Sequence, residues 1–77
     1  MAKDYIVEIY KGLGNTAKIE KITGKKAFLD DKLKKDTYRV IFSQDFEGNF
    51  VYHVICFETL KEAQSHVAEY PFFVKVV

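Results

Sequence analysis

The stretch that decides the fold is FETLKEAQSHVAEYP, residues 57–71. Its apolar residues recur at helical spacing and form one stripe. The members of that stripe are Leu60, Ala63, Val67 and Tyr70. Thr59 and Glu62 have the spacing of a capping box, in which each side chain bonds a backbone N–H at the helix start. Pro71 ends the helix, because the residue before a proline disfavours the α conformation. The stretch therefore predicts an amphipathic helix with one apolar face.

A β-hairpin is predicted directly before this helix. Residues 38–43 alternate apolar and polar side chains, which is typical of a strand with one apolar face. Residues 45–49 form a turn, in which Gly48 or Asn49 takes positive φ. Residues 50–57, FVYHVICF, are apolar on both faces, as expected for a central strand covered on both sides or for a strand at an interface.

The register of this hairpin stays open at the level of the sequence. A five-residue loop pairs Phe42 with Tyr52, whereas a two-residue loop at Glu47-Gly48 pairs Phe42 with His53. A slip of one residue moves every side chain to the other face of the sheet, so the two alternatives predict different surfaces.

Two further strands are predicted at residues 5–10 and 72–77. Residues 12–15 form a turn, and residues 16–23 fit a returning strand better than a helical turn. Residues 24–36 fit either one short helix or a loop. The residues that would anchor that helix are Phe28 or Leu29 together with Leu33.

Together these elements predict an α+β fold, with residues 1–77 in a single domain. Its small antiparallel or mixed sheet of four or five strands is covered on one face by the C-terminal helix. The expected order is β-β-(loop or short helix)-β-β-α-β.

Composition narrows the function classes. Apolar residues make up 48% of the 77 residues and aromatic residues 16%, which argues against a disordered chain. The net charge of +1 disfavours both an acidic DNA mimic and a uniformly basic nucleic-acid binder. Cys56 is the only cysteine, so an intramolecular disulfide and a multi-cysteine metal site are excluded. No apolar run has the length of a membrane helix and no signal stretch opens the chain, so we expect a cytoplasmic protein without a membrane partner.

The residues that could carry chemistry are few. His53 and Cys56 are three apart on one predicted strand, so their side chains point to opposite faces and cannot pair. We expect Cys56 to be a small buried hydrophobe, His53 a packed strand residue and His66 a solvated one. The histidines lack metal-ligand spacing, and Gly12-x-Gly14 lacks the rest of a dinucleotide-binding loop. No metal, cofactor or enzymatic activity is therefore predicted.

Charge is distributed unevenly along the chain. Residues 1–39 carry ten Lys+Arg against six Asp+Glu, and residues 40–77 carry two against five. Such a basic segment is either a solvated face or a patch that meets phosphates or an acidic protein surface. The lysines of this candidate patch are Lys18, Lys21, Lys25, Lys26, Lys32, Lys34 and Lys35.

In size and layout the chain is similar to many small phage or mobile-element proteins that bind and block a host assembly, although it shares no specific motif with them. The best-supported hypothesis is a non-enzymatic protein-binding module, with an inhibitor of a larger host assembly as one form of it. The candidate contact residues are Tyr10, Arg39, Ile41 and Phe46.

The alternative is nucleic-acid binding through the lysine-rich segment 18–35. An enzyme with a site assembled across a subunit interface ranks last. Because one helix covers only one face of a sheet, we also expect a homodimer or a partner-binding surface on the opposite face. In the alternative, the lysine-rich segment folds back over that face through Phe28, Leu29 and Leu33 and leaves a monomer.

Overall fold

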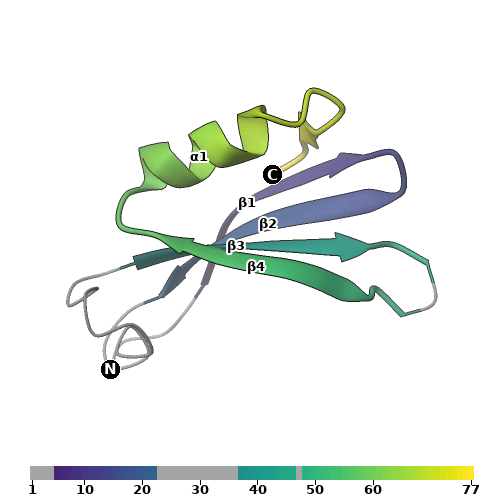
Figure 1. Cartoon of the computed structure of the whole chain (residues 1–77), viewed down its shortest axis with the longest axis horizontal. Coiled ribbons are helices and arrows are strands. Elements are labelled where there is room, and N and C mark those ends of the chain that lie inside the picture. Colours follow the sequence, from purple (N-terminus) through teal and green to yellow (C-terminus); the bar gives the residue numbers. More distant parts are fainter. Residues whose placement is uncertain (1–4, 23–36, 47) are drawn as a thin grey trace.

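The computed structural model describes residues 5–22, 37–46 and 48–77, which form a twisted sheet with one helix above it (Figure 1). The elements are β1 (Tyr5–Gly12), β2 (Asn15–Ile22), β3 (Thr37–Gln44), β4 (Val51–Phe57), α1 (Leu60–Ala68) and β5 (Val74–Lys75). The sheet has five strands in the order β4-β3-β2-β1-β5, and every neighbouring pair is antiparallel. The prediction of an α+β fold with a small antiparallel sheet is confirmed. The predicted alternatives for residues 24–36 lie outside the described residues.

Helix α1 begins as its sequence predicts. Thr59 is the N-cap, its side chain accepts a hydrogen bond from the Glu62 N–H, and the Glu62 carboxylate accepts one from the Thr59 N–H. The helix ends at Ala68, and Glu69 is its C-cap, so the last turn closes before Pro71. Thr59, Glu62 and Pro71 together fix where the helix lies in the sequence.

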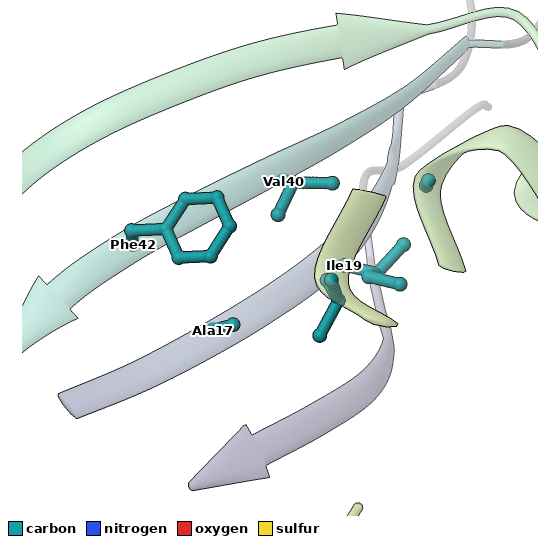
Figure 2. Packing of buried hydrophobic residues seen from close by; sticks show 6 residues of the cluster. Ala17, Ile19, Val40 and Phe42 are labelled. Atoms are coloured by element: carbon teal, nitrogen blue, oxygen red, sulfur yellow. The ribbon is translucent and has the colours of Figure 1, made fainter. Parts of the chain in front are cut away.

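The core forms between α1 and the face of the sheet that it covers. Ala63 and Val67 of α1 are buried in one cluster with side chains from β2 and β3. Those sheet residues are Ala17, Ile19, Val40 and Phe42 (Figure 2). They alternate along their strands, and the cross-strand pairs Ala17–Phe42 and Ile19–Val40 place them side by side. The apolar stripe of the helix therefore packs on the apolar stripe of two neighbouring strands.

The β3–β4 hairpin combines both registers that the sequence allowed. Near the turn, Ser43 pairs with Val51 and the Gln44 N–H donates to the Phe50 carbonyl, as a five-residue loop requires. A bulge then inserts Tyr52, so that Phe42 lies opposite His53. Both turn residues Gly48 and Asn49 have positive φ, as the sequence indicated.

Strand β4 lies at the edge of the sheet and not at its centre. Coverage on both faces therefore does not explain the apolar composition of β4. Beyond β4, the chain crosses the sheet through α1 and returns at the opposite edge as β5, which pairs with β1 (Figure 1). Only Val74–Lys75 of the predicted strand 72–77 is strand.

Candidate partner-binding surface

The face of the sheet opposite α1 carries the candidate surface, which we call the open face. Side chains alternate along a strand, so residues between or paired with the core positions can be assigned to this face from the register. Its apolar members are Ile6, Ile9, Ile22, Ile41, Val51, Val54 and Val74, of which Ile22 is buried. Most are exposed, with 49% of Val51 and 48% of Val54 accessible to solvent. No element among the described residues packs on this face in the way that α1 packs on the other.

The open face is apolar along β4 and at Ile41 of β3, and it is charged at Lys18, Glu20 and Arg39. Ile41 lies between Val54 on β4 and Lys18 on β2. Lys18 is exposed and has Ile9 on its other side, so its side chain lies between those of two isoleucines, Ile41 and Ile9. One row away, Arg39 Nε donates to Glu20 Oε1 at 3.0 Å and neutralises it. Lys18 is thus the charge that the centre of this face presents to solvent.

A polar cluster closes the open face at its hairpin end. The Thr16 hydroxyl is buried and donates to Asp45, and Lys11 Nζ donates to Thr16 Oγ1 at 3.0 Å. Lys11 Nζ also lies 3.7 Å from Asp45 Oδ2. Because these groups satisfy one another, they join the β1–β2 turn to the β3–β4 turn and form a polar border for the apolar row.

Three of the four predicted contact residues lie on the open face or at its border. Ile41 is half-buried at the centre of the face, and Arg39 is half-buried in its ion pair with Glu20. Phe46 is 59% exposed at the tip of the β3–β4 hairpin. Tyr10 lies elsewhere: it faces α1, is half-buried and packs against the core. The bulge between Ile6 and Glu8 shifts the alternation of β1 and separates Tyr10 from Ile6, with which strict alternation would group it.

On the α1 side, Tyr10 belongs to a buried polar network centred on Glu8. Glu8 accepts from the Tyr10 hydroxyl at 2.5 Å and from Gln64 Nε2 at 2.8 Å, and Lys75 Nζ lies 3.1 Å from it. Burial raises the pKa of Glu8, but the hydrogen bonds from Tyr10, Lys75 and Gln64 outweigh it, and the net pKa lies below the ordinary 4.5. The network joins β1, α1 and β5, so its role in the described structure is to hold the fold together.

The two lysines of the candidate patch that fall in the described residues lie on opposite faces. Lys18 is on the open face, whereas Lys21 is on the α1 side, with Nζ 5.4 Å from the centre of the Tyr38 ring. Their spacing of three along β2 produces this separation. The other five lysines of the patch, Lys25, Lys26, Lys32, Lys34 and Lys35, lie outside the described residues.

Cys56 and His66 both differ from what the sequence predicts. Cys56 is exposed, because it pairs with Arg39 on the open face of an edge strand, where no layer covers it. His66 is half-buried among aromatic rings, with ring centroids 5.3 Å from Phe57 and 5.6 Å from Phe42. Its Nε2 is buried without a hydrogen-bond partner in the described part of the chain. In the sequence, His66 flanks the apolar stripe of the helix. In the structure, its side chain is turned toward the protein interior.

A shallow groove runs beside His66, between α1 and the end of β4. The residues that line it are Phe57, Thr59, Lys61, Glu62, Ser65, His66 and Glu69. His66 Nδ1 lies 3.8 Å from Glu69 Oε1, while Nε2 is turned into the protein.

Comparison of the chain with models of protein families, with curated proteins and with solved structures finds no match to any of them. Within residues 5–22, 37–46 and 48–77, no helix has the length and apolar character to cross a membrane. The same residues contain no group of three or more His, Cys, Asp or Glu side chains placed to hold a metal ion. Function has to be inferred from the open face and the strand edge that borders it.

Proposed function

We propose that this chain is a non-enzymatic protein-binding module that docks through the open face. The observation that carries the proposal is the row Val54–Ile41–Lys18, in which an exposed valine and a half-buried isoleucine lie beside an exposed lysine and which no described element covers. Contiguous apolar surface of this kind on a small protein marks a site of interaction. An inhibitor that covers a site on a larger assembly is one form that such a module takes.

The chemistry of the row indicates the kind of partner surface. Burying Lys18 without an opposite charge is costly, so the partner has to supply a carboxylate at that point. Around it, the partner has to supply apolar side chains for Ile41 and Val54. Glu20 and Arg39 neutralise each other and can be covered together. The expected partner surface is therefore an apolar patch with one acidic side chain near its centre.

Affinity capture with matched variants tests this proposal. The wild-type chain is compared with Ile41→Glu and Lys18→Glu, which place a carboxylate in the row, and with Tyr5→Glu, which places one at an exposed position on the α1 side of β1. We expect a partner captured by the wild type and by Tyr5→Glu to be lost from both open-face variants. Equal capture by all four proteins excludes the open face as the docking surface. Capture of nothing by the wild type, from the lysate of its native host, excludes the protein-binding function.

Nucleic-acid binding is the second candidate, favoured by the exposed Lys18 and by Lys11 nearby on the same face. Phosphate contacts release counterions, so such binding weakens steeply as salt rises. Anisotropy titrations with single- and double-stranded probes at about 50 mM salt decide between the candidates. Binding there that is lost at higher salt and in Lys18→Glu supports this candidate, and the absence of binding removes it.

A further inference from the structure

The two edges of the sheet are built differently. Strand β5 is two residues long and carries Lys75, which are features that prevent a second strand from pairing with an edge. Strand β4 is seven residues long, has no charged residue or proline, and exposes Val51, Tyr52 and Val54. Of the usual protections it has only the bulge at Tyr52, near its beginning. Among the described residues, no strand pairs with the outer side of the remainder of β4.

The register shows which backbone groups of β4 face outward. On β3, the Gln44 N–H points to β4, where it donates to Phe50. Backbone groups alternate along a strand, so those of Val40 also point to β4, where Ile55 is its partner. The backbone N–H and carbonyl of Ile55 therefore point to β3 and bond there. Its neighbours Val54 and Cys56 direct theirs to the open edge.

We propose that β4 pairs antiparallel with β4 of a second copy of this chain, about a two-fold axis at Ile55. Val54 of each copy then lies opposite Cys56 of the other, and each such pair exchanges two backbone hydrogen bonds. The axis makes the contact self-complementary and closed, as a symmetric dimer requires. The two sheets become one continuous sheet, and the two open faces become one surface of twice the area.

The charges on α1 favour a second copy over another strand. Residue 55 lies midway along the strand between His53 and Phe57, and the ring of His66 lies 6.1 Å from that of His53 and 5.3 Å from that of Phe57. The middle of α1 is therefore level with Ile55, so the axis passes beside Ser65, next to His66. Lys61 and Glu69 are equally far from Ser65 along the helix, and both line the groove on the β4 side.

Rotation about this axis brings the two helices side by side in opposite directions. Lys61 of each copy then faces Glu69 of the other, so the groove residues that had no role in the site described above acquire one. Strand β4 contains no Lys, Arg, Asp or Glu, so its pairing with an identical strand brings no like charges of these residues together. Head-to-tail pairing of β4 with β5 would meet only a two-residue strand, and it lacks these contacts.

The mass in solution tests the dimer. Light scattering over a roughly hundredfold concentration range should show the mass rising from 9.0 kDa toward twice that value. Val54→Pro removes an outward N–H and leaves the β3 side intact, so it should remain monomeric with an unchanged circular dichroism spectrum. Val54→Thr keeps the N–H and should still dimerise, as should the open-face variant Ile41→Glu. A wild type that stays at 9.0 kDa overturns the proposal, as does a folded Val54→Pro variant that dimerises.

A cross-linking experiment tests the register without relying on a proline. Paired residues of this kind have Cα atoms about 5.5 Å apart, within the range of a disulfide. Val54→Cys should therefore form covalent dimers through residues 54 and 56 on mild oxidation, and Val54→Cys combined with Cys56→Ser should not. Peptide mapping that finds only links between two Cys56 residues, or none, contradicts the axis at Ile55.

Charge reversal tests the helix contacts. Lys61→Glu or Glu69→Lys alone should weaken the dimer by about threefold to tenfold, because each places like charges together across the axis. The double variant restores opposite charges and should recover the wild-type dissociation constant. Additive weakening in the double variant excludes the contact. These readouts need no partner protein, so they succeed or fail independently of the capture experiment.

Discussion

The Tyr10 hydroxyl donates a hydrogen bond to the Glu8 carboxylate two residues before it, and both side chains lie under α1. Gln64 reaches the same carboxylate from the helix, and Lys75 reaches it from β5. One ionised group thus holds together three elements that are far apart in the sequence.

Acid should weaken the fold through Glu8. Its pKa is below 4.5 in the folded chain, because the hydrogen bonds outweigh the effect of burial, so its contribution is fully present above the unfolded pKa. That contribution is lost as pH falls through 4.5 toward the folded value. Glu8→Gln should lower the free energy of unfolding at neutral pH by about 1–3 kcal/mol. Urea unfolding from pH 7 to pH 3 should show a smaller loss of stability for Glu8→Gln than for the wild type; equal losses would contradict this.

Alkali should weaken the fold through Tyr10. Burial and the hydrogen bond to Glu8 raise the pKa of Tyr10 to about 12 from 10.0. A raised pKa contributes stability that is present below 10 and lost as pH rises through about 12. Tyr10→Phe should remove this part of the pH dependence and cost about 1–2 kcal/mol at neutral pH. The measurement is unfolding free energy against pH, with Tyr5→Phe as the control on an exposed ring.

Gly12 and Gly14 should respond differently to a methyl group. A Cβ on Gly12 would lie 2.0 Å from the Phe72 carbonyl oxygen, so Gly12→Ala has to displace the chain that leads into β5. A loss of at least about 2 kcal/mol is expected. A Cβ on Gly14 meets nothing within 4 Å, so the positive φ is the only source of strain in Gly14→Ala. This strain should lower the free energy of unfolding by about 1 kcal/mol. Thermal unfolding of both variants gives the comparison, and a Gly12→Ala protein as stable as Gly14→Ala would contradict the close approach.

His66→Phe should stabilise the fold by about 1 kcal/mol. The ring packs between Phe42 and Phe57, and its buried Nε2 has no hydrogen-bond partner among the described residues. Removing an unsatisfied polar atom recovers its desolvation cost. Denaturant unfolding measures the change, and His53→Phe on the exposed strand position serves as the control. A destabilised His66→Phe protein would show that Nε2 has a role that the packing does not reveal.

Local signals in the sequence were sufficient for the helix and for the class of fold. Thr59, Glu62 and the apolar stripe act within a few residues of one another, so their consequence is readable without the tertiary structure. The position of β4 was not readable in this way, because an apolar strand at an edge and one at a centre have the same composition. The same ambiguity explains why the sequence predicts a buried Cys56, whereas the structure exposes it.

Bulges explain the remaining differences. The bulge between Ile6 and Glu8 moved Tyr10 to the α1 side, and the bulge at Tyr52 set His53 opposite Phe42. A bulge adds a single residue to a strand. Such an addition cannot be recognised in a sequence that has apolar residues on both faces of the strand. Of the predicted contact residues, Ile41, Arg39 and Phe46 lie where a surface is available, and their role in binding stays a prediction.

The pairing of β1 with β5 has a consequence for synthesis of the chain. Strands β1 to β4 follow one another and can pair as each is completed, but Tyr10 and Lys11 on the second side of β1 pair with β5, which follows all the other strands in the sequence. Contacts between such distant segments slow folding, because a long loop has to close first. During translation, the backbone groups on the outer side of β1 therefore stay unpaired until Val74 and Lys75 leave the ribosome. Over that interval neither β1 nor β4 has a described partner strand on its outer side, and completion of β5 then covers β1 at Tyr10 and Lys11.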